Sequence, residues 1–178
     1  MGGQQAVRQR MGWVSTEELD QLDWDAVYED QLPQLYNYFR FRLGTDADVE
    51  ELTSRTFENA WRARERYRRD LAAFSTWLFT IARNVATDHL RTRRAHVPID
   101  AVAEPATENT PEREAEQHSN LAHLARLTAK LPPRERELIA LKYGAALNNR
   151  LIAKLTGLTE SNVGTILHRV VQTLRAQW

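Results

Sequence analysis

The chain has 178 residues, 42% of them hydrophobic, which is enough for one medium domain or two small ones. Its 24 basic and 24 acidic side chains cancel, so the total charge does not indicate a nucleic-acid binder. The absence of cysteine excludes disulfides, thiolate metal ligands and cysteine nucleophiles. No apolar run approaches the ~20 residues that a transmembrane helix needs. We therefore expect a cytoplasmic protein without membrane insertion.

The N-terminal half has helical periodicity almost throughout. After a polar leader at residues 1–22, which we expect to be disordered, residues 23–95 form the first predicted domain. Its first helix should end at Gly44, since glycine accepts the left-handed conformation that terminates helices. A second helix should begin near Asp46 with an acidic first turn. A third helix is predicted from Thr76 to about Arg93.

The composition changes sharply after the third helix. Residues 96–117 contain three prolines and five glutamates but few large apolar side chains, which predicts a flexible acidic linker. Helical periodicity resumes in residues 118–178, where Pro132 and Pro133 should open a helix over Arg134–Tyr143. The sequence therefore predicts an all-α fold: two small helical domains joined by a tether.

The last thirty residues have the spacing of a helix-turn-helix. A small residue, Ala153, stands where two helices would cross, and Gly157 would supply the positive φ of the turn. Leu158, Val163 and Ile166 would fill the small core between the helices. An ordinary amphipathic hairpin is the alternative interpretation.

The second helix of this unit has one polar face. Thr159 can cap the helix, and the apolar stripe begins at Val163. A short polar face that carries amide, hydroxyl and arginine groups suits the major groove of DNA. The side chains on that face are Ser161, Asn162, Thr165, His168, Arg169 and Gln172.

Two motifs extend this interpretation to the whole chain. Residues Trp77–Arg91 contain the pattern W-L-x-x-I-A-R-N-x-x-x-D-x-L-R. This run resembles the region 2 signature of bacterial RNA polymerase sigma factors of the extracytoplasmic-function (ECF) type. Asp48–Trp61 resembles the preceding helix of that family, and Leu158–Arg175 resembles the end of sigma region 4. The resemblance covers roughly Trp24–Trp178 and keeps the family's order.

The resemblance implies that residues 23–95 are sigma region 2, which opens the −10 promoter element. On the predicted helix, Leu78 and Val85 share an apolar face, and the opposite face is polar and basic, as a phosphate backbone requires. Trp61 and Trp77 are expected to pack in the core. The loop after Trp61 would form a base pocket, with Tyr67 and Phe74 stacking on a base. Core packing is an equal alternative for Phe74. The other implied −10 contacts are Arg83, Asn84, Thr87, Asp88 and Arg91.

The resemblance also implies binding to core RNA polymerase, through the clamp helices of β′ and through the β subunit. Residues 118–178 would be region 4, which reads the −35 element with the polar face described above. The linker, residues 96–117, would run through a positively charged channel near the RNA exit path, although a plain solvated spacer is the alternative. The polymerase-binding side chains would be Glu51, Ser54, Arg55, Glu58 and Arg62.

The sequence departs from the family pattern at three positions. Ser54-Arg55 stands where Gln-Glu is usual, which puts a cation on the predicted clamp surface. Gly164 and Ile166 occupy positions that are often basic, which predicts weaker phosphate anchoring and a smaller salt dependence. Gly164 should also cost about 1 kcal/mol of helix stability relative to alanine.

The function implied is promoter-specific transcription initiation by a sigma factor. A free-standing helix-turn-helix regulator is one alternative, although it leaves Trp77–Arg91 unexplained. A degenerate sigma-like protein that binds polymerase or an anti-sigma factor without initiating is another. An anti-sigma factor is itself a family expectation. We expect neither a cofactor nor a metal nor catalysis, because the sequence has no phosphate-binding glycine loop and its histidines form no ligand set.

Overall fold

The computed structural model describes residues 24–44, 47–68, 70–96, 123–124 and 126–178. These residues contain helices and no strand, so the all-α prediction is confirmed for them. The predicted leader, and all but the first residue of the predicted linker, lie outside them. The elements are α2 (Trp24–Leu43), α3 (Val49–Ala63), the 3₁₀ helix η2 (Arg64–Arg66), α4 (Phe74–His96), α6 (Pro133–Ile139), the π-helix η3 (Ala140–Gly144), α7 (Asn149–Thr156) and α8 (Glu160–Ala176).

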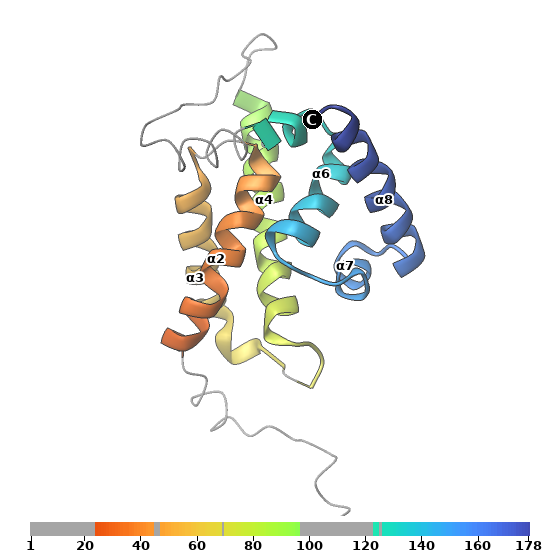
Figure 1. Ribbon diagram of the computed structural model, residues 1–178. Helices are drawn as coiled ribbons and strands as arrows, with labels where there is room; N and C mark the ends of the chain where they lie inside the picture. The colour runs from red at the N-terminus through yellow and green to blue at the C-terminus, as the bar shows by residue number, and fades with distance from the viewer. Residues whose placement is uncertain (1–23, 45–46, 69, 97–122, 125) are drawn as a thin grey trace, which may run out of the picture.

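The elements form two groups that lie side by side. Helices α2, α3 and α4 make the first group, and α6, α7 and α8 make the second (Figure 1). The first helix ends before Gly44, whose φ of 75° confirms the predicted left-handed stop. Helix α4 is longer than predicted at both ends, since it starts at Phe74 and runs to His96. The predicted helix over Arg134–Tyr143 is present as α6, which continues from Ala140 as the π-helix η3.

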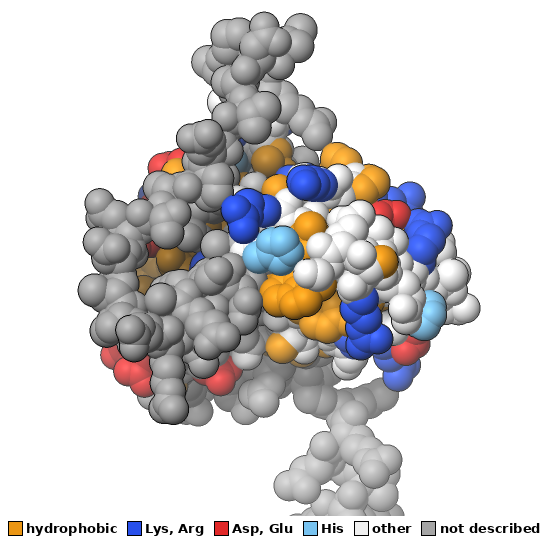
Figure 2. All heavy atoms as spheres, turned by 45° about the horizontal axis from the view of Figure 1, so that its top comes forward, with side chains coloured by type: hydrophobic (Ala, Val, Ile, Leu, Met, Phe, Trp, Pro, Cys, Tyr) orange, Lys and Arg blue, Asp and Glu red, His pale blue; other side chains and the backbone are white. Residues whose placement is uncertain are grey.

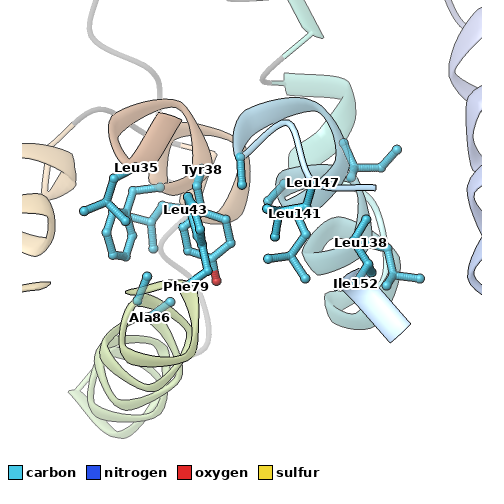
Figure 3. Close-up of a cluster of buried hydrophobic side chains, with 14 of the residues drawn as sticks. Leu35, Tyr38, Leu43, Phe79, Ala86, Leu138, Leu141, Leu147 and Ile152 are labelled. Atoms are coloured by element: carbon cyan, nitrogen blue, oxygen red, sulfur yellow. The ribbon is translucent and has the colours of Figure 1, made fainter. Parts of the chain in front are cut away.

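One hydrophobic core runs through both groups of helices. Tyr38 and Phe39 of α2, Phe79 of α4, Leu141 of η3 and Ile152 of α7 are all fully buried. Figure 3 shows α2 side chains between those of α4 and those of the C-terminal helices. Two small helical domains joined by a linker were expected, and the structure has two groups of helices. These groups also pack against each other, as burial of such large apolar side chains favours.

The backbones of the two groups approach each other closely at Gly144. A Cβ atom built on Gly144 would lie 2.7 Å from the Cα and 2.8 Å from the backbone nitrogen of Tyr38. Real Cβ atoms do not come so near to another backbone, so only glycine fits here. The next turn holds Ala146 at a φ of 54°, which is left-handed and strained for a residue with a side chain. The last residue of η3 therefore packs directly against the backbone of α2, and the turn after it is strained.

The helix-turn-helix has the geometry that the sequence predicts. Gly157 ends α7 with a φ of 72°, and its backbone N–H donates to the Ala153 carbonyl. The Thr159 hydroxyl accepts a hydrogen bond from the Asn162 backbone N–H at 3.2 Å, which confirms the predicted cap. A second cap had no prediction: the Asn148 side chain accepts from the backbone N–H of Leu151. Both helices are thus fixed at their N-terminal ends.

Gly157→Ala is expected to lower the free energy of unfolding by about 1–2 kcal/mol, the cost of the left-handed region for a residue with a Cβ. No atom lies within 4 Å of the position a Cβ would take, so the penalty comes from the backbone alone. Gly164→Ala is the matched control. It lies inside α8 with 3.5 Å of room to Asn149 Nδ2, and should raise stability by about 0.5–1 kcal/mol. Urea unfolding, followed by circular dichroism, measures the free energy of unfolding of both variants. Equal free energies for Gly157→Ala and the parent chain would contradict the assignment of Gly157 to a left-handed turn.

Candidate nucleic-acid interface

The polar face of α8 is open to solvent. Val163 and Val170 anchor the helix on the core with 0% and 1% exposure. The side chains predicted to read DNA lie on the other side, and all of them are exposed: Ser161, Asn162, Thr165, His168, Arg169 and Gln172. The Arg169 guanidinium reaches back to α6, where its Nη2 donates to Glu135 Oε1 at 2.7 Å. The arginine of this face is thus held by a carboxylate in the packed arrangement.

The two departures on α8 lie at the edge of that face. Gly164 is half-buried, and a side chain there would point toward Asn149 of α7. Ile166 is also half-buried and packs against the core. Ile166 therefore contributes to packing where a basic residue would contribute charge. The prediction of weaker phosphate anchoring stays a prediction.

The C-terminal helices carry more basic than acidic side chains. Figure 2 shows several Lys and Arg side chains spread over the part of the molecule to which α6, α7 and α8 belong, with few acidic ones among them. Exposed basic residues on α7 of this part of the chain include Arg150 and Lys154. The overall balance of charge hides this local excess, which suits contact with a phosphate backbone.

A second polar face lies on α4. Leu78 and Ala82 are fully buried and Val85 nearly so, which confirms the predicted apolar side of this helix. Four of the residues predicted to touch the −10 strand are exposed on its other side: Asn84, Thr87, Asp88 and Arg91. Arg91 Nη2 lies 3.2 Å from Asp88 Oδ1, in an exposed pair whose net energy is small. The face presents amide, hydroxyl and charged groups together.

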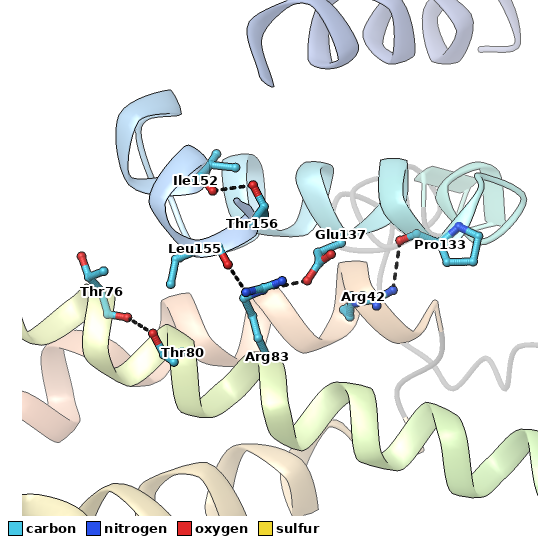
Figure 4. Close-up of polar contacts among 9 residues, drawn as sticks. All are labelled: Arg42, Thr76, Thr80, Arg83, Pro133, Glu137, Ile152, Leu155 and Thr156. Atoms are coloured by element: carbon cyan, nitrogen blue, oxygen red, sulfur yellow. Dashed lines mark hydrogen bonds and ion pairs between the residues drawn. The ribbon is translucent and has the colours of Figure 1, made fainter. Parts of the chain in front are cut away.

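Arg83 does not belong to that exposed face. Its Nε donates to Glu137 Oε1 at 2.7 Å, and its Nη1 donates to the backbone carbonyl of Leu155 (Figure 4). The side chains of the ion pair are only 25% and 15% exposed. The placement of Arg83 on the solvent face is wrong for this packed form, because α6 and α7 cover that side of α4. Sequence periodicity alone carries no signal of such a contact.

Aromatic side chains fill the end of the first group of helices. Tyr67 packs on Trp77 and Phe74 with ring centroids 5.0 and 5.5 Å apart. Trp24 joins the cluster through edge contacts with Phe74 and with Trp61. Trp77 packs as expected, whereas the core placement of Trp61 is wrong, since it is 49% exposed. The contacts of Phe74 favour packing in this form.

The loop between η2 and α4 presents a different side chain to solvent. Tyr67, predicted to stack on a base, is only 4% exposed, and its hydroxyl donates to the Ala72 carbonyl. Leu71 is 74% exposed, which is unusual for a large apolar residue. The sequence analysis did not single out Leu71. A bulky apolar residue next to the basic stretch that follows Trp61 is the signal that could have found it.

The predicted polymerase-binding residues share one face of α3. Glu51, Ser54, Arg55, Glu58 and Arg62 are all exposed, as the helical period predicts. Arg62 Nη2 lies 3.5 Å from Glu58 Oε2, one turn away. Arg55 places a positive charge between two acidic residues of the same face.

A polar cluster joins the start of α3 to the end of α4. His89 Nε2 lies 3.3 Å from Asp48 Oδ2, and Arg93 Nη1 lies 3.8 Å from the same oxygen. With Ala47 and Thr92 these residues line an open hollow of about 490 Å³. Within the described part of the chain, no group of acidic, histidine or cysteine side chains has the arrangement of a metal site. No helix there is long and apolar enough to cross a membrane.

Comparison with known proteins gives these faces a context. The sigma-70 region 2 family matches residues 27–96, and the sigma-70 region 4 family matches residues 122–174. The ECF RNA polymerase sigma factor BldN of Streptomyces coelicolor is 31% identical over 152 residues, which are 83% of this chain and 57% of that relative. The ECF RNA polymerase sigma factor ShbA of Streptomyces griseus is 30% identical over 155 residues, 81% of each chain. The chain belongs to the ECF sigma factors.

A solved structure agrees with this assignment. The sigma factor superposes on CnrH, in the structure of CnrH in complex with the cytosolic domain of CnrY, with a TM-score of 0.60 and 25% sequence identity. The match covers 92% of this chain and 89% of that one. The region 2 match begins within α2 and includes α3 and α4, and the region 4 match includes α6, η3 and α7 and ends within α8. Arg83 is therefore a region 2 residue that bonds to region 4.

Proposed function

We propose that this sigma factor binds core RNA polymerase and directs it to one class of promoter, with region 2 opening the −10 element and region 4 reading the −35 element. The observation that carries the proposal is the pair of exposed polar faces, on α4 and on α8, each within the matching sigma region. A single DNA-binding face would suit a free-standing regulator equally well. Two faces in the family's order favour a two-part promoter reader.

The −10 contact is assigned to α4 and to the loop before it. The exposed face of α4 presents donors and acceptors to an unpaired strand through Asn84, Thr87, Asp88 and Arg91. Arg83 would join this face if region 4 moved away from region 2. In the loop before α4, Leu71 is an exposed apolar group. Apolar side chains that enter a base step help to unstack the duplex. This supports a role for Leu71 in opening the −10 element, in place of the stacking role first given to Tyr67.

Leu71→Ala is expected to slow open-complex formation about tenfold, because wedge and stacking contacts are typically worth about 1–3 kcal/mol. Binding to core polymerase should not change, since Leu71 lies in the loop before α4 and is not one of the residues of the α3 face assigned to polymerase. Permanganate reactivity of −10 thymines measures strand opening. Ala73→Ser, an exposed position in the same loop, is the control. Normal opening by the leucine variant on a duplex promoter would contradict the assignment.

The polymerase contact is assigned to the exposed face of α3. Its charged groups alternate in sign, so they can set the orientation of a docked partner. Arg55 departs from the usual carboxylate, and we expect the clamp contact to be altered there. Elsewhere on the face, Glu58 and Arg62 form an ion pair one turn apart.

The remaining assignments follow from membership of the family. The sigma factor would work in the cytoplasm, where core polymerase and promoter DNA are found, and would catalyse no reaction itself. Residues 96–117 would form the linker between residues 23–95 and residues 118–178. An anti-sigma factor would hold it inactive. CnrH, a structural relative, is known in complex with the cytosolic domain of CnrY.

The test is to mix the purified chain with core polymerase and to footprint the complex on genomic promoter fragments. Formation of a holoenzyme that protects both −10 and −35 regions is expected. Polymerase binding without promoter protection would favour the degenerate sigma-like protein, which the departures at Arg55, Gly164 and Ile166 suggest. Protection of DNA by the chain alone, with no binding to polymerase, would favour the free-standing regulator.

A further inference from the structure

The amide side chain of Asn149 has no hydrogen-bond partner among the described residues. Asn149 is the first residue of α7 and is half-buried. Its Oδ1 atom is buried and accepts no hydrogen bond. Its Nδ2 atom has no partner either but is not buried, so the donor end of the amide reaches solvent. Most polar groups in such places are bonded within the protein, so a free amide here calls for a binding partner from outside.

Gly164 of α8 leaves this amide uncovered. A Cβ atom built on Gly164 would lie 3.5 Å from Asn149 Nδ2, which is ordinary contact, and no other atom lies within 4 Å of it. Packing within the protein therefore does not require glycine at this position, although glycine lowers the stability of a helix. A longer side chain would lie over the amide nitrogen. The glycine leaves a notch, formed by Gly164 and Asn149, in which the donor stays accessible.

The notch lies at the edge of the polar face of α8. Ser161 and His168, both exposed, are one turn before and one turn after Gly164 on the same side of the helix. A helix about 10–12 Å wide fills a major groove about 12 Å wide, so the edges of its polar face meet the sugar-phosphate walls. In helix-turn-helix proteins the first helix crosses that backbone. Asn149 Nδ2 is thus placed where a phosphate would lie.

Resting on the function proposed above, we propose that Asn149 donates through Nδ2 to a phosphate of the −35 duplex, which enters the notch at Gly164. A basic residue is common at position 164 in the family, and here a neutral amide from α7 takes over its contact. A neutral donor releases no counterion, so it adds affinity without adding salt dependence. It also reads no base, so it positions region 4 equally on every sequence. The choice of base stays with the polar face of α8.

The experiment measures binding of the holoenzyme to fluorescent promoter duplexes at several salt concentrations. Asn149→Ala should weaken binding about tenfold, as the loss of a hydrogen bond to a charged group does. The salt slope should not change, and the loss should be the same on duplexes with single −35 base pairs replaced. Asn149→Asp should bind more weakly still, because a carboxylate repels the phosphate, while an acidic first turn favours α7. Gln177→Glu makes the same change beyond the far end of α8 and should stay within about twofold.

Substitutions at Gly164 test the notch from the other helix. Gly164→Leu covers the amide with a good helix former, so it should weaken binding about tenfold without lowering the free energy of unfolding. The Asn149→Ala/Gly164→Leu double variant should bind no more weakly than either single variant, because both remove one contact. Gly164→Lys supplies a cation in place of the amide. It should recover the parent affinity with a salt slope that is larger by about 1.

Unchanged binding by both Asn149 variants, each folded by circular dichroism, would overturn the proposal. A loss confined to one base pair would show base reading and would also overturn it, as would full additivity of Asn149→Ala and Gly164→Leu. If Asn149→Ala does not fold, Asn149→Asp decides. A parent holoenzyme that protects no promoter refutes the proposed function instead. Binding of the free chain to non-specific duplex at low salt then tests the Asn149 contact, because a phosphate contact does not depend on sequence.

Discussion

Replacing Asn84 and Arg91 together with alanine is expected to reduce promoter opening by about 100-fold, while binding to core polymerase stays unchanged. Both side chains are exposed on α4, so their loss should not disturb the core. Hydrogen bonds to charged groups are worth about 1.5–3 kcal/mol each, and every 1.36 kcal/mol is tenfold in rate. Single-round transcription from a duplex promoter measures the loss.

Two comparisons make this prediction specific to strand contact. Arg126→Ala removes an exposed arginine from outside either face and should leave opening within about twofold, the range of exposed substitutions. A template with a pre-melted −10 region should restore part of the activity of the double variant, since opening is no longer required. Full activity of the double variant on the duplex template would place the strand contact elsewhere.

Replacing Asn162 and Arg169 with alanine should weaken holoenzyme binding to the −35 element by about 10- to 100-fold, since each good base or phosphate contact is worth about 1–3 kcal/mol. Both residues are on the exposed face of α8, where Thr159 fixes the first turn. The salt dependence of binding should also fall, by a slope of about 1 for the lost arginine. Titration of fluorescent promoter fragments at several salt concentrations measures both effects.

Arg169 also bonds to Glu135, so a control must separate the two roles. Glu135→Gln weakens the ion pair and keeps the arginine. The holoenzyme with Glu135→Gln should bind the −35 element at least as tightly as the parent, because the Arg169 guanidinium is then free to contact DNA. If Glu135→Gln were as defective as the double variant, Arg169 would act through α6 rather than through DNA.

Local features of the fold could be predicted because neighbouring residues decide them. The left-handed stop at Gly157, the Thr159 cap and the apolar stripe that begins at Val163 depend on contacts within a few residues. The polar face of α8 follows from the helical period once that stripe is known. The same reasoning gave the exposed residues of α3 and most of those of α4.

Contacts between distant segments could not be predicted in this way. Arg83 faces Glu137, 54 residues away, and the helical period assigns it to solvent because it is charged. The need for glycine at position 144 arises from the close approach of the Tyr38 backbone of α2, which no local pattern encodes. Trp61 was expected in the core because it is large and apolar, yet its place on α3 leaves about half of it exposed. In each case tertiary packing outweighs local preference.

In vitro transcription with core polymerase on supercoiled genomic promoter templates, followed by mapping of the transcript 5′ ends, tests the central claim most directly. The account predicts that the chain stimulates initiation at a limited set of start sites, and that these share elements near −10 and −35. The Asn84/Arg91 double variant should lose these transcripts and still bind core polymerase. No stimulation by the parent chain, together with no co-purification with core polymerase, would contradict the account.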